Sequence, residues 1–256
     1  MSDEHKRTGA GRQFESRTSS SADSRSAEEL EEGGAPLNRR VLTPGGHTLD
    51  RSQPAFPVFH RKFANPAPLG LSGFALTTFM LSLINLSARG VTVPNVVVGP
   101  AIFYGGVVQF LAGMWEFAEG NTFGATAFTS YGAFWISYAF IVSPWSGIGG
   151  AYDNPQELKN GVAFFLFGFF IFTTILTLAT LRASIALFFV FFTVDCTFLM
   201  LGLSELGIGN ASALQVAGGS FGIVAAFAAW YVAAVSLINP TGFFNLPVGD
   251  LSRKAD

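Results

Sequence analysis

The chain has 256 residues, of which 50% are hydrophobic and 12% are charged, so its charged fraction is about half that of an ordinary soluble domain. Its 28 Phe and a mean hydropathy of +0.42 exclude a disordered chain, and its single Cys excludes a disulfide scaffold. The formal net charge of −2 gives no general attraction to nucleic acid. We therefore expect a protein of the lipid bilayer that has no nucleic-acid partner.

The first part of the chain differs sharply in charge from the remainder. Residues 1–67 hold ten of the 15 basic side chains, nine of the 17 acidic ones and all three His. This Ser-, Gly- and Glu-rich stretch has too few apolar residues to offset the entropy cost of ordering its backbone. We expect a disordered cytoplasmic tail over residues 1–64, a transmembrane domain over residues 65–240 and a cytoplasmic C-terminal tail over residues 241–256.

The apolar runs that follow the tail have about the 20 residues that an α-helix needs to cross roughly 30 Å of hydrocarbon. The fourth and fifth runs form one stretch interrupted by Arg182, and two crossings fit its length better than one helix. The sequence thus predicts an all-α membrane protein with six transmembrane helices, approximately Leu69–Ala88, Val96–Ala118, Phe123–Val142, Gly161–Leu181, Ser184–Leu203 and Ala213–Ile238.

The basic residues predict the orientation of these helices. In a six-span arrangement, 13 of the 15 Lys and Arg side chains lie on the side of the two termini, whereas Arg89 and Lys159 lie on the other side. Cytoplasmic loops carry the excess of Lys and Arg in membrane proteins. We therefore expect both termini in the cytoplasm and a multi-pass protein of the plasma membrane.

Small residues in the sixth span predict how the helices associate. Close packing at ridges of small residues brings membrane helices together. Two such ridges predict packing on two sides of this helix, and packing within one chain explains most ridges of this kind. The ridges have four-residue spacing and consist of Gly218, Gly222 and Ala226, and of Ala225, Ala229 and Ala233.

A stripe of hydroxyl groups runs along the third span. Thr122, Thr126 and Thr129 are three or four residues apart and therefore lie on one face of a helix. Such a stripe can form hydrogen bonds between helices, each worth under about 1 kcal/mol, or it can line a wet path. The spacing alone leaves both interpretations open.

Two carboxyl groups, those of Glu116 and Asp195, are predicted at membrane depth, and no Lys, Arg or His falls in the interior of a predicted span. A carboxylate ligand therefore finds no fixed positive charge there. It must be held by hydroxyl or amide donors and helix N-termini, or cross as its neutral acid, because stripping a bare carboxylate of water costs about 20 kcal/mol in the idealised case. Glu116 or Asp195 could carry the accompanying proton, and the alternative for each is a purely structural hydrogen bond.

The first span opens with Asn65-Pro66-Ala67, which favours a helix start because proline suits the first turn and Asn65 can satisfy an orphan N–H. Aquaporins pair two such tripeptides, but no second Asn-Pro-Ala exists here. The longer pattern resembles the acetate uptake transporter family, of the succinate-acetate permease type with bacterial and fungal members, and the long N-terminal tail favours the fungal branch. The resemblance covers residues 65–240 and rests on Asn-Pro-Ala-Pro-Leu-Gly-Leu at 65–71, Ile-Phe-Tyr-Gly-Gly at 102–106, Gln109, Gly113, Glu116, Gly-Asn-Thr-Phe-Gly at 120–124, Thr-Ala-Phe-Thr-Ser-Tyr-Gly at 126–132 and Phe-Trp at 134–135.

This resemblance implies a protomer of six helices around a central pore, assembled as a homohexamer, that moves acetate and other small monocarboxylates with protons or through a channel-like path. It also implies an apolar constriction formed by Phe74, Tyr131 and Val194. The family has Leu at the third position, so the shorter Val194 predicts a wider gate that admits larger acids such as lactate. The Tyr131 hydroxyl could offer a hydrogen bond to the carboxyl group, and the alternative for the trio is an ordinary aromatic core. Asp195 is not part of the family motif.

Further polar residues in or beside the first three spans are candidates for substrate binding. The function itself stays open between an acetate carrier, an ammonium-export or ammonia-sensing membrane protein, and a receptor that does not transport. The residues argue against an enzyme, because no His lies in the spans and Cys196 lacks a visible partner, so we expect no catalytic residue, metal or cofactor. The substrate-binding candidates are Asn65, Thr77, Gln109, Asn121, Thr122, Thr126 and Thr129.

Overall fold

The computed structural model describes residues 63–242 and 244–251. These residues belong to one compact unit, Phe59–Asp256. The N-terminal tail expected over residues 1–64 lies, apart from Phe63 and Ala64, outside the described residues, as does the end of the C-terminal tail. Disorder of the N-terminal tail therefore stays a prediction.

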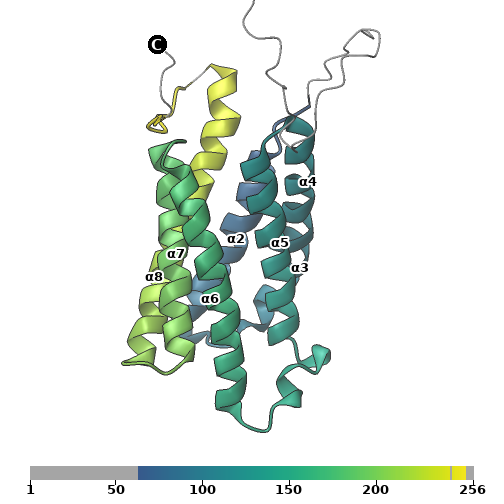
Figure 1. Ribbon diagram of the computed structural model, residues 1–256, viewed down its shortest axis with the longest axis vertical. Coiled ribbons are helices and arrows are strands. Elements are labelled where there is room, and N and C mark those ends of the chain that lie inside the picture. The colour runs from purple at the N-terminus through teal and green to yellow at the C-terminus, as the bar shows by residue number, and fades with distance from the viewer. Residues whose placement is uncertain (1–62, 243, 252–256) are drawn as a thin grey trace, which may run out of the picture. The chain divides into compact units, whose positions relative to one another are not determined.

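Six helical stretches are long and apolar enough to cross a membrane, which confirms the predicted all-α architecture with six spans (Figure 1). Among the described residues no β-strand occurs, and one isolated β-bridge joins Ser184 to Asp250. The spans are α2 (Ala67–Asn85), a composite span (Pro94–Glu119), α5 (Thr122–Val142), α6 (Pro155–Thr180), α7 (Ile185–Glu205) and α8 (Ala211–Ile238).

Five of the six spans begin where a side chain accepts a hydrogen bond from an N–H group of the first turn. Asn154 accepts from the N–H of Gln156 at 2.9 Å, and Pro155 occupies the first turn. As a result α6 starts at Pro155 rather than at the expected Gly161. Comparable bonds start α2, α5, α7 and α8: Asn65 accepts from Ala67, Asn121 from Gly124, Ser184 from Leu187 and Asn210 from Ala213.

The hydropathy of the sequence suggested one regular helix for the second span, but the structure shows a composite one. It consists of η2 (Pro94–Val97), α3 (Val98–Ile102), the π-helical segment η3 (Phe103–Val108) and α4 (Gln109–Glu119). At Gly105, a Cβ would lie 2.5 Å from the Thr77 Oγ1 of α2. Glycine therefore lets the wide π turn approach α2 more closely than any other residue would.

The six spans contact one another in a closed order around the unit. The order runs α8, α2, the composite span, α5, α6, α7 and back to α8, and the contact between α5 and α6 is the least extensive. On α8, a Cβ at Gly218 would meet Leu201 of α7 at 2.7 Å, and one at Gly222 would collide with the Ser82 hydroxyl of α2. Both predicted ridges are buried, so each is used for packing within the subunit.

The residues after α8 return to the start of α7 and form a segment that we call the C-terminal strap, residues 246–251. The first N–H groups of a helix lack partners within the helix, and carbonyl groups of the strap accept two of them at the start of α7. The strap therefore fixes the turn between α6 and α7 that the sequence placed near Arg182. Its bonds run from the N–H of Ile185 to the Gly249 carbonyl at 2.7 Å, from Ala186 to Val248 at 3.0 Å, from Leu251 to Ala183 at 3.1 Å, and from the Tyr231 hydroxyl to the Pro247 carbonyl at 2.6 Å.

Candidate functional site

Two internal cavities lie between the helices and meet at three side chains. The first, here called the polar cavity, has a volume of about 80 Å³, and the second, the apolar cavity, has a volume of about 160 Å³. Phe74 of α2, Tyr131 of α5 and Val194 of α7 are the three residues that line both cavities. They are 7%, 4% and 5% exposed, so they face the interior of the helix ring rather than lipid.

Aromatic rings surround this meeting point. The rings of Phe74 and Tyr131 have centroids 5.9 Å apart, and Tyr131 also contacts Phe169 and Phe172 of α6 and Phe198 of α7. Rings at 4.5–7 Å gain from edge and offset contacts beyond their buried area. The trio expected from the resemblance is thus brought together, while its role as a constriction stays a prediction.

The Tyr131 hydroxyl is already engaged. It lies 2.8 Å from the hydroxyl of Thr173 on α6, and Thr173 is fully buried. This pair could not be predicted from the sequence, because 42 residues separate the two positions and helical periodicity does not say which faces of different helices meet.

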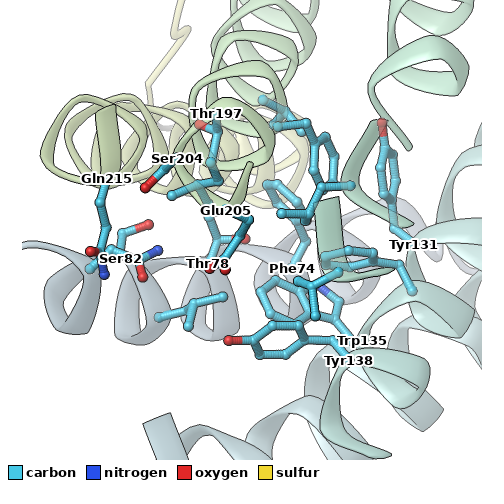
Figure 2. Close-up of a pocket in the computed structure, with 18 residues that line it drawn as sticks. Phe74, Thr78, Ser82, Tyr131, Trp135, Tyr138, Thr197, Ser204, Glu205 and Gln215 are labelled. Carbon is cyan, nitrogen blue, oxygen red and sulfur yellow. The ribbon is translucent and has the colours of Figure 1, made fainter. Parts of the chain in front are cut away.

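The polar cavity is chemically divided. Figure 2 shows Ser82, Ser204, Glu205 and Gln215 toward one end, with Phe74, Trp135 and Tyr131 toward the other. This polar group was not predicted from the sequence, although Glu205 is recognisable there as the acid at the end of an apolar run. Hydroxyl, amide and carboxyl groups at one end and rings at the other suit a small molecule with one polar and one apolar end.

A wider cavity of about 440 Å³ adjoins the polar cavity, and we call it the vestibule. Asn85, Tyr138 and Glu205 line both spaces, and residues of the loops before the composite span and after α5 line the outer part of the vestibule. Lys159 also faces the vestibule. Vestibule, polar cavity and apolar cavity therefore follow one another along the helices, and the shared trio separates the last two.

The apolar cavity has few polar groups, and a buried carboxyl lies directly behind its wall. Gln109, Asn121 and Gly124 line this cavity. The Asn121 Nδ2 donates to the Glu116 Oε2 at 2.7 Å, and a Cβ at Gly124 would lie 2.9 Å from the Glu116 carboxyl. Glu116 is buried and is not among the residues that line the cavity, so its carboxyl lies one side chain away from the cavity rather than in it.

Unpartnered polar atoms are concentrated along this series of spaces. Within the described part of the chain, five buried side-chain polar atoms lack a hydrogen-bond partner. Buried polar groups normally have a partner, so each exception marks a site that a guest molecule or water could complete. Two belong to residues of the polar cavity (Thr78 Oγ1 and Trp135 Nε1), one to the apolar cavity (Gln109 Oε1), one to the vestibule (Ser143 Oγ), and the fifth is Glu116 Oε1.

The other polar residues predicted for substrate binding line neither of the two main cavities. Thr126 and Thr129 donate to carbonyl groups of their own helix, at 2.8 Å to Thr122 and 2.6 Å to Ala125. Thr77 likewise donates to the Gly73 carbonyl at 2.9 Å and packs against Gly105. Asn65 and Thr122 are exposed and also lie outside both cavities.

Asp195, next to Val194, points away from both cavities. Both of its carboxyl oxygens accept from the Thr174 hydroxyl of α6, at 3.0 and 3.1 Å, and it lines neither cavity. Asp195 therefore joins α6 to α7. Across residues 63–242 and 244–251, no three His, Cys, Asp or Glu side chains group closely enough to hold a metal ion.

Comparison with known proteins places this geometry in context. Residues 46–253 match the sequence profile of the GPR1/FUN34/yaaH family. The chain is 50% identical over 203 residues to acetate permease A of Emericella nidulans, covering 73% of this chain and 66% of that protein. It is 49% identical over 191 residues to ammonia transport outward protein 2 of Saccharomyces cerevisiae, covering 73% of this chain and 65% of that protein. The chain thus spans about two thirds of the length of these fungal relatives.

Bacterial relatives match over nearly their whole length. The succinate-acetate/proton symporter SatP of Escherichia coli is 39% identical over 191 residues, covering 74% of this chain and 97% of that protein. The solved structure of the bacterial acetate channel SatP is similar with a TM-score of 0.66 and 37% identity, covering 73% of this chain and all of that one. About three quarters of this chain is therefore similar to nearly the whole of these bacterial proteins.

Proposed function

Because the chain belongs to the GPR1/FUN34/yaaH family, we propose that it is a membrane transporter of acetate and other small monocarboxylates. Relatives named for acetate permease and succinate-acetate/proton symport support the substrate class. The single observation that carries the proposal is the pair of cavities that share Phe74, Tyr131 and Val194. In this proposal the trio forms the narrow point of a path through the helix ring.

The chemistry of the trio fits a short carboxylic acid better than an inorganic ion. An apolar narrowing excludes bulk water and hydrated ions by dewetting. A methyl group can pass between rings, and the neutral carboxyl avoids the idealised cost of about 20 kcal/mol for stripping water from an ion. No Lys, Arg or His is among the described residues that line the two cavities, so these cavities offer the anion no fixed positive charge.

A proton crosses with the acid in this mechanism, either on the substrate itself or by way of Glu116. The Glu116 carboxyl has one oxygen bonded to Asn121, which lines the apolar cavity, and one oxygen without a partner in the described chain. Carboxyl groups inside membrane bundles commonly serve proton relays. Asp195 is the weaker candidate because its carboxyl faces Thr174 and neither cavity.

The proposal also includes a place and an assembly. In this proposal the protein lies in the plasma membrane, and both termini lie in the cytoplasm, as the excess of basic residues on that side indicates. The vestibule then opens to the outside. The proposed homohexamer rests on the family resemblance alone, since both small-residue ridges of α8 pack inside the subunit. Apolar side chains that α4 exposes, such as those of Trp115 and Phe117, can contact lipid or another copy of the chain.

Purified protein in liposomes tests the proposal. An inward pH gradient should drive uptake of labelled acetate above that of empty vesicles, and Val194→Phe should reduce it because the larger ring fills the narrow point. The matched control is Val216→Phe, the same substitution at an exposed position of α8. Wild-type uptake no faster than in empty vesicles would defeat acetate transport.

Ammonia transport is the second candidate, because a relative 49% identical to this chain carries that name. Neutral ammonia meets the same barrier as neutral acetic acid, but it has no methyl group to occupy an aromatic narrowing. Uptake of labelled methylammonium, measured in the same vesicles in place of acetate, distinguishes an ammonia transporter from an acetate transporter. A receptor without transport predicts no flux of either compound.

A further inference from the structure

The Tyr131–Thr173 pair links the narrow point to a helix that supplies none of its residues. Tyr131 belongs to α5 and Thr173 to α6, and their hydroxyl oxygens are 2.8 Å apart. These two helices have the least extensive contact in the ring, and the rings of Phe169 and Phe172 fill the space around Tyr131. The hydrogen bond is thus a directional contact within an otherwise apolar seam.

The Thr173 side chain does not line the proposed path. It is fully buried and lines neither cavity. A phenol ring held only by other rings can tilt, because aromatic contacts tolerate a range of angles, whereas a hydrogen bond weakens steeply when its geometry departs from linear. Any influence of Thr173 on passage therefore runs through the direction of the Tyr131 ring.

We propose that Thr173 is a positioning residue whose hydroxyl holds the Tyr131 ring across the narrow point and thereby sets the size of acid that passes. This inference rests on the proposed function, in which Phe74, Tyr131 and Val194 limit the path. The sequence suggested that the Tyr131 hydroxyl forms a hydrogen bond with the carboxyl group of the substrate. In this inference the hydroxyl is instead held by Thr173 of the neighbouring helix.

Uptake of acetate and of the longer butyrate by reconstituted protein tests the inference. Thr173→Val keeps the side-chain shape and removes the hydroxyl, whereas Thr173→Ser keeps the hydroxyl. Thr177→Val is the matched control, because its hydroxyl donates at 2.8 Å to the Thr173 carbonyl within the same helix. Tyr131→Phe removes the other partner, and the double variant Tyr131→Phe/Thr173→Val completes the cycle.

Thr173→Val should raise the butyrate-to-acetate ratio about threefold, the effect of losing one average interhelical hydrogen bond in a membrane. Thr173→Ser and Thr177→Val should keep the wild-type ratio. Tyr131→Phe should match Thr173→Val, and the double variant should add nothing further. An unchanged ratio in Thr173→Val, or additive effects in the double variant, would overturn the inference.

A second readout does not depend on transport. With 3-fluorotyrosine at position 131, the fluorine resonance should broaden or split in Thr173→Val and stay single in Thr173→Ser. A spectrum that is the same in wild-type protein, Thr173→Val and Thr173→Ser shows that Thr173 does not hold the ring and overturns the inference. Wild-type protein that takes up no acetate defeats the proposed function, while the fluorine spectrum still decides whether the ring is held.

Discussion

The Asn121 side chain donates from its Nδ2 to the Glu116 carboxyl at 2.7 Å across the turn that joins α4 to α5. The same side chain accepts from the Gly124 N–H at 3.0 Å and so starts α5. Asn121 therefore connects a buried acid, a helix start and the wall of the apolar cavity. A proton on Glu116 would lie one side chain away from a passing acid.

Glu116→Gln should lower proton-driven acetate uptake more than acetate exchange at equal pH. The glutamine amide oxygen can still accept from Asn121, so the substitution removes the exchangeable proton and keeps the hydrogen bond. Glu119→Gln, at the exposed last residue of α4, is the control and should affect neither assay. Equal loss in both assays for Glu116→Gln would identify a structural role.

Val194→Leu should lower the lactate-to-acetate uptake ratio by roughly tenfold, the lower end of what one methylene contributes to selectivity. The added methylene would narrow the point that both cavities share. Val190→Leu is the matched control, because Val190 is buried on the same helix and lines the apolar cavity but not the polar cavity. A ratio that stays the same in Val194→Leu removes this position from the selectivity argument.

Gly222→Ala should destabilise the domain by about 1–3 kcal/mol, the usual cost of overpacking a close contact. A Cβ at this position of α8 collides with the Ser82 hydroxyl of α2. Gly168→Ala on α6 is the control, since a Cβ there meets nothing within 4 Å. Thermal unfolding in detergent measures both, and a Gly222→Ala protein as stable as the Gly168→Ala protein contradicts the packing described for α8.

Asp195→Asn should leave the dependence of acetate uptake on the pH gradient unchanged. An amide oxygen can accept the same hydrogen bond from Thr174, and Asp195 lines neither cavity. Uptake measured at several imposed gradients checks this expectation. A selective loss of gradient-driven uptake would place the coupling proton on Asp195 instead of Glu116.

The six spans could be predicted because hydrocarbon thickness fixes the length of a crossing helix, and Arg182 correctly divided the fourth and fifth spans. The π-helical segment around Gly105 could not be predicted, because a change in the backbone hydrogen-bond pattern does not alter the hydropathy of the sequence. The start of α6 was placed too late, since Asn154 and Pro155 extend the helix through polar residues that a hydropathy reading treats as loop.

The candidate site was predictable only in part. Phe74, Tyr131 and Val194 came from family resemblance, and their spacing alone would not have grouped them. Thr173 and Glu205 escaped notice because periodicity describes one helix at a time and says nothing about which faces of separate helices meet. The hydroxyl stripe at Thr126 and Thr129 bonds within its own helix, a pairing that the sequence spacing allowed but did not single out.

The C-terminal strap has a practical consequence for handling the protein. Val248 and Gly249 provide carbonyl groups to the start of α7, and α7 carries Val194 two and a half turns further along. An affinity tag or fluorescent fusion joined directly after Leu251 would therefore disturb the start of the helix that shapes the narrow point, whereas a flexible linker placed after Asp256 would leave these hydrogen bonds undisturbed.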